Sequence, residues 1–281
     1  METETLDTHL KYGNLNGVTL SMDERLSLQL AFEQLKNDFK LEELFFWGKL
    51  IGTVKDYFIV MTLDYTVLQS GFPAKRFFWC SSSNYIFASL PQPQMHHAAK
   101  FENMKTYFTG EYDRVLIEVG GAPVVIDELA GIIIPPKHIT ELDRVSFVIH
   151  TIEDQCQVVP RHSYKYTPLQ EIKRNEAFNG LSRDQAFDLN HFHHFRPIQQ
   201  KEKLMILERE EAVYNDNFLD EITKDYPKNC WSLVKDCAES TATVRSLMWP
   251  GYYAYHRIHT HIFGGLYIGY GIRNQDLPFM L

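Results

Sequence analysis

The sequence predicts an α+β fold in which an antiparallel β-sheet is packed by a few helices. Two regions, at about residues 44–90 and 230–271, contain aromatic and β-branched runs of strand length separated by turn residues. Segments before and between them carry apolar residues at helical spacing. The 281 residues include 19 Phe, 15 Tyr and 4 Trp, and rings that bury roughly 150–250 Å² each can fill a large core. Disorder over the whole length is therefore excluded.

A helix and a hairpin are expected at residues 20–63. Ser21 and Glu24 form the pattern of a capping box, in which each side chain satisfies a free backbone donor at the start of a helix. Over residues 21–39 the apolar side chains expected on one buried face are those of Leu28, Ala31, Phe32, Leu35 and Phe39. Residues 44–52 and 57–63 have the character of two hairpin strands. Shorter strands are expected at 76–81 and 84–90.

Residues from about 91 to 137 are predicted to form an irregular insertion with at most short local structure. Pro91, Pro93 and the Gly-Gly-Ala-Pro run at 120–123 interrupt both helices and strands. Regular structure is expected to resume with a helix at 138–153 and a strand at 157–159.

A second capping box, from Ser182 to Gln185, predicts a helix that runs to about residue 194, before Pro197. A short helix is expected at 217–225. The carboxyl-terminal third is predicted to be an antiparallel sheet at about 230–271, with strands at 230–236, 241–249, 252–258 and 262–270. Five of the fifteen glycines lie between residues 251 and 271, as tight turns and bent strands require. The whole chain, 1–281, is expected to be a single domain.

Charge and cysteine usage favour a protein that binds neither nucleic acid nor membranes. The chain has 28 basic and 36 acidic side chains, a formal charge of −8, whereas phosphate binding needs a clustered basic surface. No apolar stretch approaches the ~18 residues of a membrane span. The four cysteines form no C-x-x-C pair, which favours free, buried thiols in a reducing, cytosolic compartment.

A search for catalytic motifs finds no metalloprotease, nucleophile-elbow or phosphate-loop pattern. The carboxylates of Asp220 and Glu221 are interpreted as a solvated helix face, and the aromatic runs at 45–47 and 77–79 as strand core in preference to a ligand pocket. No enzyme activity and no cofactor are expected.

Two groups of histidines leave one alternative open. They are His191, His193 and His194, and His256, His259 and His261. Imidazole is a common metal ligand, so the chain could instead be a soluble metal- or ligand-binding protein. Neither group has an acidic or Cys residue at the usual short ligand spacing. Surface or packing histidines are the favoured interpretation, and no metal site is predicted.

The segment 244–256, with its Arg-Ser-Leu-Met-Trp-Pro-Gly core, resembles the radial spoke head proteins of motile cilia and flagella, and the core is shared by the larger subunits, proteins 4 and 6. The end of the chain, at 267–271 and 274–281, is similar to the radial spoke head protein 9 family. Segments 46–52, 56–59, 158–161, 178–182, 192–196 and 225–232 agree in the same order. Residues 70–137 match little, and His259 and His261 lie outside the pattern.

The resemblance implies a non-catalytic structural subunit of the axonemal radial spoke head, located in the cytoskeleton of the cilium or flagellum. Its implied partners are the other head subunits, of the protein 4 and 6 type. The head makes transient contact with central-pair projections and so conveys mechanical signals to dynein arms. The −8 charge favours a salt-screened contact of this kind.

Two apolar segments are candidates for a partner interface, since aromatic side chains and Met are enriched at interface cores. They comprise Trp249, Pro250, Gly251, Tyr252 and Tyr253, and the tail Leu277, Pro278, Phe279, Met280 and Leu281. Because an apolar chain end frays unless it is docked, the tail packs either on its own sheet or on a neighbouring subunit. Packing within the chain is an equally open interpretation for both segments.

Overall fold

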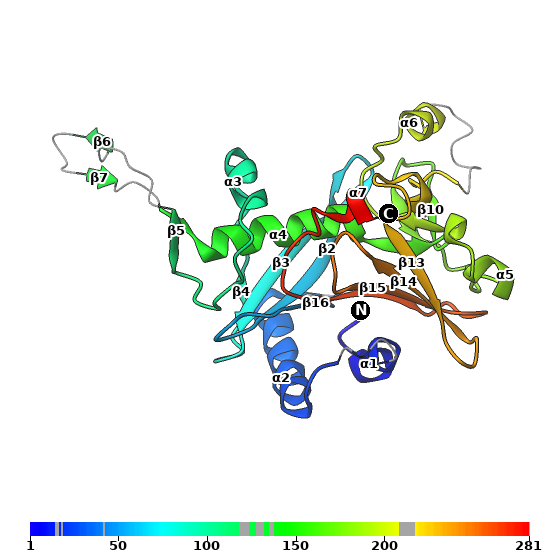
Figure 1. The fold of residues 1–281 in the computed structure, drawn as a ribbon, viewed down its shortest axis with the longest axis horizontal. Helices are drawn as coiled ribbons and strands as arrows, with labels where there is room; N and C mark the ends of the chain where they lie inside the picture. The colour runs from blue at the N-terminus through cyan, green and yellow to red at the C-terminus, as the bar shows by residue number, and fades with distance from the viewer. Residues whose placement is uncertain are drawn as a thin grey trace.

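The computed structural model in Figure 1 describes residues 1–14, 17, 19–41, 43–117, 124–127, 132–134, 138–207 and 217–280. Its centre is an eight-stranded sheet with the strand order β13-β14-β15-β16-β1-β2-β3-β4. The strands are β1 (Phe45–Leu50), β2 (Tyr57–Gln69), β3 (Phe72–Ser81), β4 (Ala88–Ser89), β13 (Trp231–Lys235), β14 (Thr241–Ser246), β15 (Tyr252–Arg257) and β16 (Phe263–Gly269). The predicted α+β class, the first hairpin and the carboxyl-terminal meander are confirmed.

The two halves of the sheet join where β1 pairs with β16. This pair is parallel, with Gly48 opposite Tyr267, whereas the other neighbouring strands of this sheet are antiparallel. A Cβ atom on Gly48 would lie 2.0 Å from the carbonyl oxygen of Tyr267, so a residue with a side chain cannot take this place without moving a strand. The sheet is therefore mixed, which corrects the expectation of a purely antiparallel one.

Helices cover both faces of the sheet (Figure 1). Helices α1 (Leu6–Asn14) and α2 (Met22–Phe39) lie on one face, and α4 (Glu141–Cys156) lies on the other. Alternate strand residues enter two separate cores: Phe58 and Val60 face α1 and α2, while Tyr57, Ile59 and Met61 face α4. A strand that is buried on both faces has a continuous apolar sequence instead of an alternating one. The aromatic runs of the sequence are accordingly strand core, as expected.

Helix α2 confirms the predicted capping box, because Ser21 and Glu24 exchange side-chain-to-backbone hydrogen bonds. Four of its five predicted apolar residues are buried, but Phe39 is exposed and touches Phe78 only edge-on. Phe39 is the last residue of the helix, where the chain turns at Lys40 with a positive φ of 51°. The prediction of a buried Phe39 is therefore wrong.

Helix α1 is an element that the sequence analysis does not predict. Its Leu6 and Leu10 enter the core beneath α2, and the Met1 amine donates to the carbonyl oxygen of Phe46 at 3.3 Å. Only two of its positions carry large aliphatic side chains, so its periodicity is too short to be recognised.

The smaller elements surround the sheet. The short strands are β5 (Val115–Ile117), β6 (Val124–Asp127), β7 (Ile132–Ile134), β8 (Ile139–Thr140), β9 (Val158–Pro160), β10 (Tyr164–Tyr166), β11 (Ile172–Arg174) and β12 (Phe192–His194). The short helices are α3 (Ala98–Glu102), α5 (Arg183–Ala186), α6 (Lys201–Leu207), α7 (Leu277–Met280) and the 3₁₀ turns η1 (Met95–His97), η2 (Leu189–His191) and η4 (Ile222–Lys224). Of the predicted insertion at 91–137, residues 118–123, 128–131 and 135–137 lie outside the described residues.

The helix predicted from Ser182 to about residue 194 is wrong in length. The capping box forms, but α5 ends at Ala186. Asp188 accepts a hydrogen bond from the backbone N–H of Asn190 at 3.0 Å, and an Asp side chain that binds nearby backbone competes with helix continuation. The following residues, 192–194, pair with β9 as a strand.

Three of the four cysteines have the buried, free thiols that the sequence analysis predicts. Cys80, Cys156 and Cys230 are free and buried, but Cys237 is free and exposed, so the expectation of burial is wrong for Cys237. None of the helices in the described part of the chain combines the length and apolarity that crossing a bilayer requires.

Candidate interface at the carboxyl-terminal turn and tail

The two predicted interface segments lie together. The turn between β14 and β15 carries Trp249, Pro250 and Gly251, and the chain after β16 returns to it. There the N–H of Asn274 donates to the carbonyl oxygen of Met248 at 2.8 Å. Local hydrogen bonding therefore positions the turn and the start of the tail as one unit.

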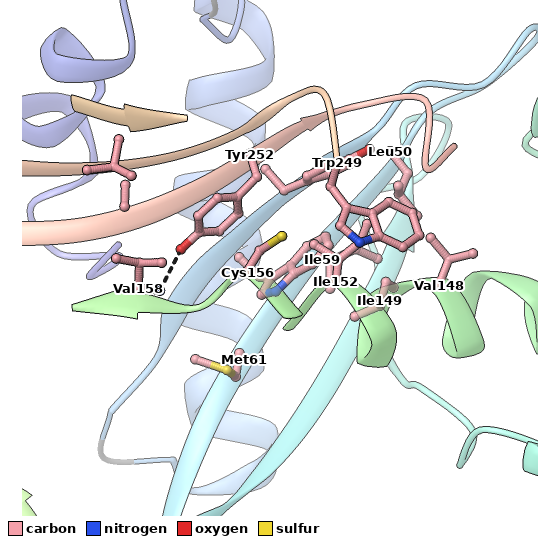
Figure 2. Close-up of a cluster of buried hydrophobic side chains, with 14 of the residues drawn as sticks. Leu50, Ile59, Met61, Val148, Ile149, Ile152, Cys156, Val158, Trp249 and Tyr252 are labelled. Carbon is pink, nitrogen blue, oxygen red and sulfur yellow. Dashed lines mark hydrogen bonds between the residues drawn. The ribbon is translucent and has the colours of Figure 1, made fainter. Parts of the chain in front are cut away.

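Trp249 and Tyr252 are core residues of this chain. Figure 2 shows the Trp249 ring directed at α4, near Val148 and Ile149, and the Tyr252 ring directed at Val158 of β9. The Trp249 ring is 4% exposed, and its Nε1–H donates to Gln155 Oε1 at 2.8 Å. The Tyr252 hydroxyl accepts from the N–H of Val158 at 3.0 Å, and burial raises the pKa of this phenol well above its usual value. These two rings pack within the chain and present no surface.

Gly251 fixes the path of the turn. Its φ of +109° favours glycine, and a Cβ atom there would lie 2.4 Å from the carbonyl oxygen of Ile268. The N–H of Ile268 donates to Gly251 O at 2.9 Å. This close approach leaves Pro250 exposed at the tip, while Tyr253 is half-buried.

The tail ends in a single helical turn, α7, with opposite environments for its residues. Leu277 is 4% exposed and belongs to the core below α4, whereas Phe279 is 90% exposed and Met280 72%. Pro278 is also exposed, and Leu281 lies outside the described residues. Leu277 thus anchors a turn that displays two large apolar side chains to solvent.

A surface hollow of about 330 Å³ lies beside this turn. Its lining includes Pro250 and Asp276, together with Tyr107 and Tyr270, whose ring centroids are 5.1 Å apart. Both tyrosines are about half exposed. The exposed Pro250, Tyr107, Tyr270, Phe279 and Met280 are called the tail surface below.

The six histidines are not assembled into one centre. His193 is buried on β12, and burial lowers the pKa of its imidazole to about 3. His194 Nε2 lies 2.8 Å from Asp225 Oδ2, which also accepts from Trp231 Nε1 at 2.8 Å. His191 is half-buried at the end of η2.

In the second histidine group, His256 is enclosed while His259 and His261 are exposed. The N–H of Leu181 donates to His256 Nε2, and His256 Nδ1 lies 3.1 Å from Ile262 O. Both ring nitrogens are therefore engaged by the protein itself. Among the described residues no three His, Cys, Asp or Glu side chains converge as a metal site would need.

Two buried carboxylates accept hydrogen bonds from distant parts of the chain and so hold those parts together. Glu141, at the start of α4, accepts from the Tyr57 hydroxyl at 2.8 Å, from the Thr109 hydroxyl at 2.7 Å and from the N–H of Gly110 at 2.8 Å. Asp220 is buried and accepts from the backbone N–H of Gln199 at 2.9 Å. The interpretation of Asp220 as solvated is therefore wrong, because the loop at Gln199 covers this carboxylate and donates a backbone hydrogen bond to it.

Comparison of the sequence with known proteins places the chain in a family. The family described as Radial spokehead-like protein matches residues 1–66. The radial spoke head protein 9 homologs of Bos taurus and Homo sapiens are 32% and 31% identical over 287 aligned residues, covering 100% of each chain. The homolog of Danio rerio is 31% identical with the same coverage. The chain belongs to the radial spoke head protein 9 family.

In this radial spoke head protein 9 family member, the Arg-Ser-Leu-Met-Trp-Pro-Gly segment forms the end of β14 and the turn that carries Trp249. The alignment with the relatives covers the whole chain, including residues 70–137.

Sequence reasoning missed Tyr107 and Tyr270 as parts of the tail surface. Tyr107 lies in the predicted irregular insertion, where no periodicity indicates which side chains face outward. Tyr270 follows the last residue of β16, so the strand alternation that orients Tyr267 inward does not extend to it. Their meeting is set by tertiary structure alone.

Proposed function

We propose that the protein is a non-catalytic structural subunit of the axonemal radial spoke head, which helps to assemble the head and passes mechanical signals from the central pair towards the dynein arms. The observation that carries this proposal is the family relation over the full length of both chains. In this role its partners are other head subunits, including those of the protein 4 and 6 type.

The tail surface supports a contact with a neighbouring subunit. Phe279 and Met280 project from a turn held by Leu277, so they are presented at little cost in chain ordering. Full burial of such a side chain is worth about 1.5–3 kcal/mol. Pro250 and the tyrosine pair Tyr107–Tyr270 add three exposed rings along the hollow that Asp276 also lines. Aromatic and Met side chains clustered in this way are typical of interface centres.

The sheet supports a load-bearing role. Its eight strands are packed on both faces, and the β1–β16 pair ties the amino-terminal half to the carboxyl-terminal half. Close-packed interiors have low compressibility and transmit strain. In the proposed role, force that enters at the tail surface reaches the far strands through continuous backbone hydrogen bonds and not through a hinge.

Fractionation of cilia tests the proposal. The tagged wild-type chain, expressed in ciliated cells that lack their own copy, should remain with detergent-extracted axonemes. The double variant Phe279→Ser, Met280→Ser should be retained less, whereas Leu169→Ser, which alters an exposed leucine outside the tail surface, should be retained like the wild type. A wild-type chain that washes out with soluble proteins would refute the spoke-head role. Full retention of the double variant would refute the tail as a contact.

The signalling part of the proposal has its own test. The head meets the central pair by a transient contact that exposed acidic side chains modulate, since exposed charges act over a Debye length of about 8 Å at physiological salt. Reversing the charge of exposed acidic residues should change the beat of reactivated axonemes at low salt more than at high salt. An unchanged beat, with normal assembly of the variant chain, would count against this part.

A further inference from the structure

Helix α2 carries a second apolar surface on the side that faces away from the sheet. Met22, Leu26 and Leu30 are 69%, 56% and 77% exposed and follow one another at a spacing of four residues. Residues at this spacing form one ridge along a helix, here about 12 Å long at 1.5 Å per residue. We call these three residues the α2 ridge.

The α2 ridge is not needed to attach the helix to its own chain. The opposite side of α2 buries Leu28, Ala31, Phe32 and Leu35 against the sheet. Glu24 binds Lys49 of β1 at 2.6 Å, and Gln29 donates to Asp7 of α1 at 2.7 Å. Single exposed apolar residues are ordinary, but contiguous ones mark contact sites. The helix is thus anchored by one face and displays the other.

The charges around the α2 ridge are acidic. Asp23 and Glu33, which lie beside the ridge, are exposed and form no ion pair with other described residues. The basic residues within the helix are engaged elsewhere: Arg25 donates to Thr19 and Leu20, and Lys36 pairs with Glu4 at 2.8 Å. A ligand of this face therefore meets apolar side chains with uncompensated negative charge beside them.

We propose that the α2 ridge docks an amphipathic helix of a different polypeptide, one with an apolar i, i+4 ridge and Lys or Arg at its margins. Two ridges of this spacing interdigitate at a crossing angle of about −50°, and opposite charges at the margins select the partner. A second copy of this chain is a poor occupant, because pairing α2 with α2 would oppose acidic margins. The inference gives the protein a second contact surface. It rests on the proposed function only in that the partner is sought among the polypeptides of the axoneme.

Site-specific photocrosslinking in assembled cilia tests the docking. A benzophenone amino acid in place of Leu30 should crosslink to one segment of another polypeptide, and mass spectrometry should map that segment to a sequence with apolar residues at i, i+4 and flanking Lys or Arg. The same probe in place of Leu169, an exposed leucine outside α2, is the control and should not reach that segment. A crosslink to this chain itself, to a segment without that pattern, or to nothing overturns the proposal.

Two sets of variants measure how much the apolar ridge and the acidic side chains beside it each contribute to docking. Leu26→Ser with Leu30→Ser should lower the retention of the chain, or the crosslink yield from a probe at Met22, about tenfold or more. Glu33→Lys should reduce the same yield more than Glu33→Gln, and the difference should shrink at high salt. Unchanged melting temperatures would show that these variants fold. Loss of the wild type from axonemes would refute the proposed function, whereas normal retention without a helical crosslink partner refutes only the docking.

Discussion

Lowering the pH from 7 to 5 should destabilise the protein through His256, a fully buried side chain of β15. Because the N–H of Leu181 donates to His256 Nε2 at 3.0 Å, that nitrogen must carry a lone pair. The proton of the neutral ring is then assigned to Nδ1, which donates to Ile262 O at 3.1 Å. Protonating Nε2 would break the first bond inside the core. Burial lowers the pKa of this imidazole to about 4.

The magnitude follows from the difference between the folded and unfolded states. An unfolded histidine has a pKa of about 6.5, so the unfolded state takes up the proton first as the pH falls. The stability that depends on the neutral ring is complete above about pH 6.5 and is lost progressively down to about pH 4. Between pH 7 and pH 5 this one group removes about 2 kcal/mol from the free energy of unfolding. His193, whose pKa burial lowers to about 3, acts in the same direction.

Urea unfolding followed by tryptophan fluorescence and circular dichroism measures the effect, with coincident transitions as the check on two-state behaviour. The variant His256→Gln should be about 1–3 kcal/mol less stable at pH 7 because it disturbs a buried hydrogen bond. Between pH 7 and pH 5, however, it should lose about 2 kcal/mol less stability than the wild type. His261→Gln, in an exposed position of the same hairpin, should behave like the wild type. Equal losses for the wild type and His256→Gln would refute the reasoning.

Three further substitutions probe the sheet, the turn and the tail. Gly48→Ala should lower the free energy of unfolding by at least about 3 kcal/mol, since its Cβ would lie 2.0 Å from Tyr267 O and force β1 from β16; an unchanged urea midpoint would contradict this. Trp249→Ala should lower it by about 3–5 kcal/mol, because a core site is emptied and Gln155 loses its donor. Calorimetry would show a negligible change if the ring were instead held by a partner subunit. Phe279→Ser should alter stability by less than about 0.5 kcal/mol, and a large fall in melting temperature would mean that its ring packs on its own chain.

The features that the sequence predicts well are local ones. The capping boxes at Ser21 and Ser182 each depend on residues three positions apart, and hairpins such as β1–β2 join neighbouring runs with short turns. The failures are non-local. The pairing of residues 192–194 with β9, which takes the place of the predicted helix, is not encoded by any spacing within 182–194. Asp220 resembles a surface carboxylate until the loop at Gln199 folds over it.

The candidate interface shows the same difference between local features, which the sequence predicts, and non-local ones, which it does not. Residue type alone gives Trp249 and Phe279 the same status as apolar interface candidates, but burial separates them completely: one ring packs against α4 and the other lies in solvent. A single sequence carries no signal for that difference, because both rings lie in segments too short to show a periodic pattern. The α2 ridge could in principle be recognised, since Met22, Leu26 and Leu30 fall on the side of the helix opposite Leu28 and Leu35.

The parallel pairing of β1 with β16 has a consequence for how the protein is made. A chain synthesised at about 5–20 residues per second needs about 10–40 s to proceed from residue 50 to residue 269, and during this time the outer edge of β1 has no strand to pair with. Exposed strand edges recruit other chains, and pairings between distant residues form slowly. Any interruption of translation before Phe263 therefore leaves an open sheet edge, and not merely a shortened subunit. Aggregation or removal of the nascent product is the expected fate of such truncations, whichever surfaces they retain.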